Sequence, residues 1–387
     1  MSSGKVVRIL SLDGGGMRGY LSAFFLQRFM QLWGKPQNEI WSNFDIIAGT
    51  SVGGIQACGY ANGLSAVDMQ AFFTQKGPWI FTIRSATDLG IDASVPSNRP
   101  NLLQKLYFLT IDEPFYKAVD PMSNYGDSRL KAELEAVFTT KTLQNLKAKV
   151  LITSYKKDTN TPVIWSNVNL PGYQGQTELA KNVAFSTGAA PVYLPPEMIG
   201  QNLYMDGGVY QNNPASLALS MAQMLYPFAK RYCVLSVGAG LGDIGFHEPT
   251  FRKELAEFRA SPALFATTRG LRPKELEKLK KLDDINAFEG VKDMFSLIEI
   301  GIGAPQEAVA KVLDYQSSLT NQNLSYYRFQ VLLDKNQDNE LDRSDIDFFP
   351  YLEGLVDAQW NQDLFKISQF INMMADSCEA QSERTAA

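Results

Sequence analysis

The chain has little of two residue types that often carry chemistry. Its 387 residues include one histidine, His247, and three widely spaced cysteines, Cys58, Cys233 and Cys378. An odd number of distant cysteines argues against a disulfide framework and against a C-x-x-C metal or redox site. A single histidine leaves one candidate for any mechanism that uses an imidazole as general base. We therefore expect a protein that folds in the reducing interior of a cell.

Long apolar runs and basic clusters are also lacking. There is no run of about 18 uncharged apolar residues, and the start of the chain, MSSGKVV, lacks the apolar segment of a signal peptide. The net charge of −5 and the isoelectric point near 5.2 argue against nucleic acid as the main partner. These absences predict a cytoplasmic protein that is soluble or peripheral to membranes, with secretion by a specialised route left open.

The sequence does contain an alternation of strands and helices. With 45% hydrophobic and 20% charged residues, the chain can bury the core of a single domain over residues 1–387. Strands are expected at 5–12, 44–48, 149–155, 162–167, 203–208 and 232–238. Helices are expected at 19–33, 52–61, 66–76, 128–138, 178–186 and 214–225. The pattern is typical of a three-layer α/β fold, in which a mostly parallel central sheet has helices on both faces.

Later segments depart from this alternation. Residues 84–101 are rich in Ser, Asn, Asp and Pro, which indicates an exposed loop. Residues from about 245 to 320 are charged and mostly helical, and we interpret them as an insertion or cap. Within them, the apolar run from Met294 to Ile302 favours buried packing over contact with a lipid surface. A closing strand and helix are expected over about 325–375, followed by a frayed tail at 376–387.

The stretch IIAGTSVGG places a serine between glycines at a strand-to-helix turn. Gly49, Ser51 and Gly53 form the pattern G-x-S-x-G. In a nucleophile elbow glycines flank the serine because the backbone is cramped there, and the strained turn lifts the hydroxyl above the sheet at a helix N-terminus. An ordinary glycine-rich turn is the alternative, and the flanking strand and helix favour the elbow. We therefore predict that Ser51 is a catalytic nucleophile.

A second glycine-rich loop, DGGGMRG, follows the first predicted strand. Gly14, Gly16 and Gly19 have the G-x-G-x-x-G spacing of a dinucleotide-binding turn. The acidic residue that should follow about 20 residues later, at the end of the second strand, is missing. An acyl-transfer serine instead needs backbone N–H groups aimed at the oxygen that becomes negative. We expect Gly14, Gly15 and Gly16 to form this oxyanion hole.

The serine also needs a general base, and the residues offer two candidates. Asp206 lies at the end of a predicted strand in LYMDGGVYQNNP, where the two glycines that follow let it approach another loop closely. His247 lies after the strand at 232–238, and the order Ser51, Asp206, His247 matches that of an α/β-hydrolase triad. The residues thus allow a Ser-Asp pair or a Ser-His-Asp triad.

Five motifs taken together resemble those of patatin-like phospholipases. They are DGGGMRG at 13–19, GTSVGG at 49–54, STGAAPVYLPP at 186–196, DGGVYQNNP at 206–214 and VLSVGAG at 234–240. The resemblance covers roughly residues 6–240. It implies the patatin-like α/β fold and a lipid acyl hydrolase, a serine esterase of the phospholipase A type. It also implies a catalytic dyad of Ser51 and Asp206, with Met17 as a further N–H donor beside the glycines of the oxyanion hole.

The resemblance also implies a mechanism and a substrate class. Fatty-acyl esters would be cleaved through a covalent acyl-Ser51 intermediate, as in other serine esterases. The expected partners are a phospholipid or other acyl lipid and a peripheral membrane surface, and no metal or other cofactor is expected. Two other functions stay open: a catalytically silent lipid-binding protein, and a nucleotide-regulated protein that binds phosphate at the glycine loop. The oligomeric state is not implied.

Three features beside the motifs have structural and functional interpretations. We expect Asp13 to orient the glycine loop, whereas Arg18 either meets a lipid phosphate or forms a structural ion pair. The stretch DKNQDNELDRSD at 334–345 resembles a calcium loop, with oxygen ligands at alternating positions. Asn339 stands where the sharp-turn glycine belongs and Asp345 where a bidentate glutamate belongs, so we do not expect a metal there.

Overall fold

The computed structural model describes residues 4–81, 128–191, 193–242, 248–268, 273–284, 305–319, 323–334, 337 and 341–375. The loop expected at 84–101, His247, the apolar run from Met294 to Ile302 and the tail at 376–387 lie outside these residues. The expectations for those segments stay predictions.

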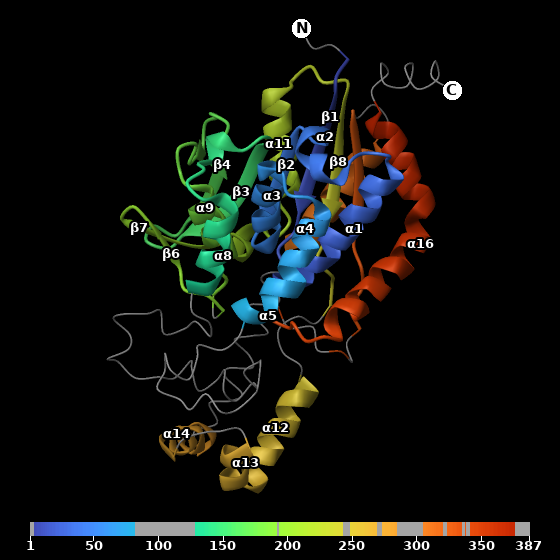
Figure 1. The fold of residues 1–387 in the computed structure, drawn as a ribbon. Coiled ribbons are helices and arrows are strands. Elements are labelled where there is room, and N and C mark those ends of the chain that lie inside the picture. Colours follow the sequence, from blue (N-terminus) through green and yellow to red (C-terminus); the bar gives the residue numbers. More distant parts are fainter. Residues whose placement is uncertain are drawn as a thin grey trace.

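The described strands form one nine-stranded sheet in the order β5-β4-β3-β2-β1-β8-β9, with β7 paired to β3 and β6 to β7 (Figure 1). Strands β3, β2, β1, β8 and β9 are mutually parallel, while β4 and β7 run antiparallel to β3. The strands are β1 Val6–Leu12, β2 Ile46–Thr50, β3 Lys149–Lys156, β4 Thr161–Ser166, β5 Tyr173–Gln174, β6 Glu197–Ile199, β7 Asn202–Asp206, β8 Arg231–Val237 and β9 Leu324–Phe329. The mostly parallel central sheet predicted from the sequence is confirmed.

Helices cover both faces of this sheet, as predicted (Figure 1). One layer contains α11 and a helix at 305–318, and the other contains α1, α3, α4, α8, α9 and α16. The helices are α1 Gly19–Leu32, α2 Ile40–Asn43, α3 Val52–Asn62, α4 Ala66–Ala71, α5 Gly77–Ile80, α8 Ser128–Phe138, α9 Ala180–Gly188, α10 Gly208–Gln211, α11 Ala215–Leu225, α12 Glu248–Ala260, α13 Pro262–Thr268, α14 Pro273–Asp284 and α16 Phe348–Met374. A π-helical turn, Phe72–Lys76, joins α4 to α5.

Strand β1 shows how the two layers share the core. Val7 and Ile9 belong to the apolar cluster of α11, whereas Leu10 and Leu12 belong to the cluster of α1. All four side chains are fully buried. A strand between two helical layers buries both faces, so its sequence is a nearly continuous apolar run.

Helix α1 is largely buried, as its apolar residues on most sides predict. Phe25 stacks on Phe329 of β9 with ring centroids 4.0 Å apart. Leu32 is the exception among its large apolar side chains and is 43% exposed. It lies on the last turn, where Trp33 packs against Phe44 instead.

The stretch interpreted as an insertion contains two kinds of helix. α13 contacts both α12 and α14, and the three helices lie away from the strands, at the lower end of Figure 1. The helix at 305–318 returns to the sheet, where Leu313 joins the apolar cluster that includes Tyr232 of β8. The domain boundaries stay a prediction, but this last helix is part of the core.

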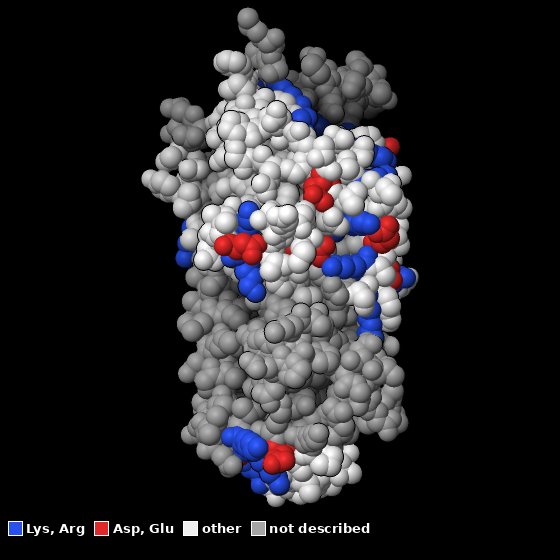
Figure 2. Space-filling model, turned by 90° about the vertical axis from the view of Figure 1, so that its left-hand side faces the viewer, with Lys and Arg blue, Asp and Glu red and all other residues white. Residues whose placement is uncertain are grey.

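The face of the molecule in Figure 2 carries mixed charge. On the face in Figure 2, acidic and basic side chains are interspersed, and its described part shows no continuous basic area. Among the described residues, no helix is both long and apolar enough to cross a membrane. That nucleic acid is not the main partner stays a prediction.

The sheet brings the motif residues to one edge. Strands β1 and β2 are parallel, with Leu12 paired to Gly49, so the residues after both strands meet beyond their carboxyl ends. Strand β7 lies along β3 with Asp206 opposite Ser154. The glycine loop, Ser51 and Asp206 therefore converge, although they are far apart in the sequence.

Candidate active site

Ser51 occupies a strained turn between β2 and α3. Its backbone has φ 56° and ψ −131°, a conformation that a residue with a side chain adopts only under constraint. A Cβ atom at Gly49 would lie 2.1 Å from the Gly53 carbonyl oxygen, and one at Gly53 would lie 2.3 Å from the Leu12 carbonyl oxygen. The two glycines thus allow a close backbone approach, which gives the turn the geometry of a nucleophile elbow.

A side chain from α9 supports this turn. The Ser51 N–H donates a hydrogen bond to Oγ1 of Thr187 at 2.8 Å. The donor is the main-chain group of the strained residue itself, and both residues are buried. The contact therefore helps to hold the unusual backbone of Ser51.

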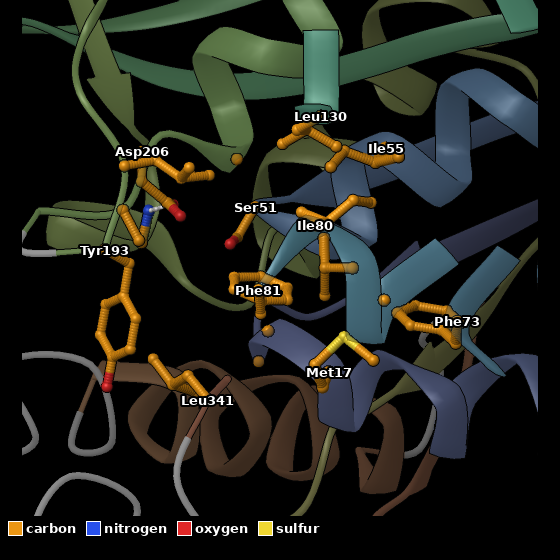
Figure 3. Close-up of a pocket in the computed structure, with 18 of the residues that line it drawn as sticks. Met17, Ser51, Ile55, Phe73, Ile80, Phe81, Leu130, Tyr193, Asp206 and Leu341 are labelled. Atoms are coloured by element: carbon orange, nitrogen blue, oxygen red, sulfur yellow. Dashed lines mark hydrogen bonds between the residues drawn. The ribbon is translucent and has the colours of Figure 1, made fainter. Parts of the chain in front are cut away.

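Asp206 points its carboxylate toward the Ser51 hydroxyl (Figure 3). The residue is 4% exposed, and its Oδ1 accepts a hydrogen bond from the Gly208 N–H at 2.7 Å. Burial raises the pKa of Asp206 to about 7, against smaller lowering effects from the Ser51 hydroxyl and the Gly208 N–H. A carboxylate with this pKa is a stronger base than an exposed one.

The N–H groups of the glycine loop differ in what they bind. Gly14 N–H donates to the Asn212 carbonyl at 3.2 Å, and Met17 N–H donates to the Leu341 carbonyl at 2.7 Å. The N–H groups of Gly15 and Gly16 have no hydrogen-bond partner among the described residues, and both residues line a cavity with Ser51. This differs from the expectation for Gly14 and Met17, whose N–H groups are already donated to carbonyl oxygens.

An apolar cavity of about 230 Å³ extends from Ser51 and Asp206 (Figure 3). Its walls come from α3, the π-helical turn, α5, α8 and the glycine loop. They include Met17, Ile55, Phe73, Ile80 and Leu130. A hydrocarbon chain is the group that such walls accommodate, since they offer little to pair with a polar ligand.

The profile of the Patatin-like phospholipase family matches residues 10–219. This range is more than half of the chain, and it contains the glycine loop, Ser51 and Asp206. The chain belongs to the patatin-like phospholipase family. The resemblance seen in the sequence motifs is thereby confirmed.

Relatives of this patatin-like chain come from bacteria, plants and mammals. The chain is 29% identical over 212 residues to a cGAMP-activated phospholipase of Pseudomonas aeruginosa, covering 54% of this chain and 55% of the relative. It is 28% identical over 271 residues to Patatin-like protein 1 of Oryza sativa subsp. indica, covering 61% and 59%. The chain thus spans a little over half the length of these curated relatives. VipD from Legionella pneumophila is similar in structure with a TM-score of 0.40 and 15% identity, over 92% of this chain and 68% of VipD.

The glycine loop of this family member is anchored by a buried ion pair. Arg328 of β9 donates to the Asp13 carboxylate at 2.8 Å and to the Ser236 hydroxyl at 3.0 Å. Burial raises the pKa of Asp13 to about 6, against the smaller lowering effect of the Arg328 guanidinium. The contact supports the expectation that Asp13 orients the loop.

Arg18 lies behind the loop and not in the cavity. It is 2% exposed, its Nε donates to the Gly15 carbonyl at 3.3 Å, and it is not among the described residues that line the cavity. Of the two roles considered for Arg18, this placement favours the structural one.

Two further candidates fall partly or wholly outside the described residues. His247 is outside them, so a histidine triad is not tested. In the calcium-like stretch, Asp334 is exposed and Asp342 is buried, but positions 335–336 and 338–340 are not described. Within the described chain, no group of three His, Cys, Asp or Glu side chains could hold a metal ion.

Sequence reasoning missed several residues that shape the site. Thr187 and Asn212 lie inside motifs quoted above, so attention to the polar residues of those motifs could have found them. Arg328 and Leu341 lie outside the family match and have no local signal, because their contacts with the glycine loop exist only in the folded chain.

Proposed function

We propose that this protein is a lipid acyl hydrolase of the phospholipase A type that uses Ser51 and Asp206 as a catalytic dyad. One observation carries the proposal: a buried carboxylate with a raised pKa faces a serine on a strained elbow, at the end of an apolar cavity. The N–H groups of Gly15 and Gly16, which have no partner within the described part of the chain, support an oxyanion hole made by these two residues.

The reaction begins with proton transfer. Ionised Asp206 accepts the Ser51 hydroxyl proton as Oγ attacks the ester carbonyl, and the carbonyl oxygen becomes negative. The Gly15 and Gly16 N–H groups donate to that oxygen, a contribution typically worth about 3 kcal/mol for each donor. Asp206 then gives its proton to the departing alcohol, which leaves an acyl-Ser51 ester. Water, deprotonated by Asp206, hydrolyses this ester by the reverse route and releases the fatty acid.

The cavity supports an acyl lipid as substrate. Its apolar walls suit a hydrocarbon chain, with the ester placed at Ser51 and the polar head group directed outward. Phospholipids and other acyl lipids share this chemistry, and both reach the protein at a membrane surface. Neither a metal nor another cofactor takes part in these steps.

A serine-directed fluorophosphonate tests the proposal. We expect it to label Ser51, and we expect Ser51→Ala to lose both labelling and the release of fatty acid from phospholipid vesicles. The exposed serine variant Ser42→Ala should behave as wild type. Labelling at another serine, together with full activity of Ser51→Ala, would contradict the assignment.

The similarity to bacterial cGAMP-activated phospholipases supports a second proposal, that cGAMP activates this hydrolase. The sequence also leaves nucleotide regulation open. Fatty-acid release by wild type should then rise on addition of cGAMP, while Ser51→Ala stays inactive. Equal activity with and without saturating cGAMP would exclude this form of regulation.

A further inference from the structure

The first turn of the helix at 305–318 lies directly behind the glycine loop. Gln306, 5% exposed, accepts a hydrogen bond at its side-chain Oε1 from Asn212 Nδ2 at 2.8 Å. Its main-chain carbonyl accepts one from Asn213 Nδ2 at 3.4 Å. Both contacts reach the stretch that follows Asp206, so this helix is tied to the catalytic region by side chains and not only by apolar packing.

Asn212 forms hydrogen bonds with both the N–H and the carbonyl group of Gly14. The Gly14 N–H donates to the Asn212 carbonyl at 3.2 Å, and Asn212 Nδ2 donates to the Gly14 carbonyl at 3.3 Å. The direction of the Gly14 carbonyl is therefore set by the side chain of Asn212.

That carbonyl shares a rigid peptide unit with the Gly15 N–H. Because the peptide bond is planar and trans, the C=O of one residue and the N–H of the next point in opposite directions. Holding the Gly14 carbonyl on Asn212 consequently fixes the direction of the Gly15 N–H, and Gly15 lines the cavity together with Ser51 and Asn212. The position of one oxyanion donor thus depends on the Asn212 amide.

Gln306 decides which way this amide faces. The Asn212 side chain offers two N–H donors on one atom and an acceptor on the other, and a half-turn would place its oxygen against the Gly14 carbonyl. With Gln306 Oε1 accepting one N–H, the other remains directed at Gly14. Removing this acceptor leaves the amide free to turn.

The neighbouring residue reaches the same loop by another route. Glu307 lies 3.5 Å from Arg328, and Arg328 pairs with Asp13 at 2.8 Å, immediately before the three glycines. Gln306 is therefore linked to Gly14 through Asn212. Its neighbour Glu307 is linked to Asp13 through Arg328.

We propose that Gln306 is a positioning residue of the oxyanion hole: through Asn212 and the Gly14 carbonyl it fixes the direction of the Gly15 N–H. This inference rests on the proposed hydrolase function. It assigns a catalytic supporting role to a helix that lies outside residues 10–219, the part of the chain matched by the family profile.

The substitution Gln306→Met tests it, because methionine has a similar length and lacks the acceptor. Gln316→Met is the matched control, since Gln316 is an exposed residue of the same helix. With a soluble ester substrate, Gln306→Met should lower kcat about tenfold to hundredfold, the effect of a small misplacement of a catalytic group, and leave KM nearly unchanged. The rate of fluorophosphonate labelling should fall as well, whereas Gln316→Met should match wild type.

Fluorophosphonate labelling of Ser51, carried to completion, gives the fraction of each variant that has a folded site. Dividing the measured rate by this fraction gives a kcat that can be compared even where a variant is partly unfolded. A normalised kcat of Gln306→Met equal to that of Gln316→Met would overturn the inference, as would a change confined to KM. Ser51→Ala is measured in parallel. If it hydrolyses the ester like wild type, the proposed function itself has failed. If it is inactive while Gln306→Met is fully active, only the role of Gln306 has failed.

Discussion

The two turns that meet at the site are built in different ways. The elbow at Ser51 is specified mainly by its own residues, because Gly49 and Gly53 allow the close backbone approach and the turn joins β2 directly to α3. The glycine loop depends on remote partners, since Asn212, Leu341 and Arg328 all bind its main chain or the adjacent Asp13. The strained serine turn is encoded within five residues, Gly49 to Gly53, whereas the position of the glycine loop depends on segments that are distant in the sequence.

The loss of the Asp206 carboxylate should have the largest effect, because neither turn can act without a base. Asp206→Asn keeps the shape and cannot accept the proton, so kcat should fall by about 10²- to 10⁴-fold. In wild type, kcat/KM should rise with pH through about 7, as Asp206 ionises. Near wild-type turnover of Asp206→Asn would show that the base lies elsewhere.

Asp206→Asn should also change the melting temperature by an amount that depends on pH. Burial raises the pKa of Asp206 from 3.8 to about 7, so the folded state favours the protonated form. That stabilisation is complete below pH 3.8 and is lost as the pH rises through about 7. Asp206→Asn should therefore melt at a higher temperature than wild type at pH 8, with a smaller difference at pH 5. Thermal unfolding at the two pH values measures this.

The glycine loop is tested next. A Cβ atom at Gly15 would lie 2.4 Å from Cβ of Ala239, so Gly15→Ala must displace the loop. We expect a loss of about 10²- to 10³-fold in kcat with a smaller change in KM, as for removal of an oxyanion donor. Ala239→Gly removes the colliding methyl group, so the double variant should recover part of the loss. No recovery would mean that the loop position is not what Gly15→Ala disturbs.

The hydrogen bond from the Ser51 N–H to Thr187 should affect kcat less than the position of the glycine loop does. Thr187→Val leaves the buried Ser51 N–H without its acceptor, which should cost about 1–3 kcal/mol of unfolding free energy. Denaturant unfolding measures this, with the exposed Thr74→Val as control. If Thr187→Val instead lowered kcat as much as Gly15→Ala without loss of stability, the elbow would depend on remote contacts as strongly as the loop.

The smallest effect is expected for His247→Gln. The proposed dyad requires no imidazole, so we expect this variant to retain most of the esterase activity and the pH profile of wild type. Removal of a triad histidine would instead cost several orders of magnitude in kcat. A loss of that size at an unchanged melting temperature would replace the dyad by a triad.

Much of the fold was predictable because its signals are local. Strand β3 was expected at 149–155 and is observed at Lys149–Lys156, and α8 was expected at 128–138 and is observed at Ser128–Phe138. A buried parallel strand is an apolar run, and an amphipathic helix repeats along its own sequence. The exposure of Leu32 was not predictable, because it depends on what packs against the last turn of α1.

The sequence by itself determined the candidate nucleophile, the glycine-rich turn and two candidates for the base, Asp206 and His247, because residue type and spacing indicate them. Only the tertiary structure decided that the N–H groups of Gly14 and Met17 donate to carbonyl oxygens, while those of Gly15 and Gly16 have no partner among the described residues. It also decided the raised pKa of Asp206 and the contact between Gln306 and Asn212. The physical reason is that hydrogen-bond partners and burial come from segments that are distant in the chain and meet only when the sheet is complete.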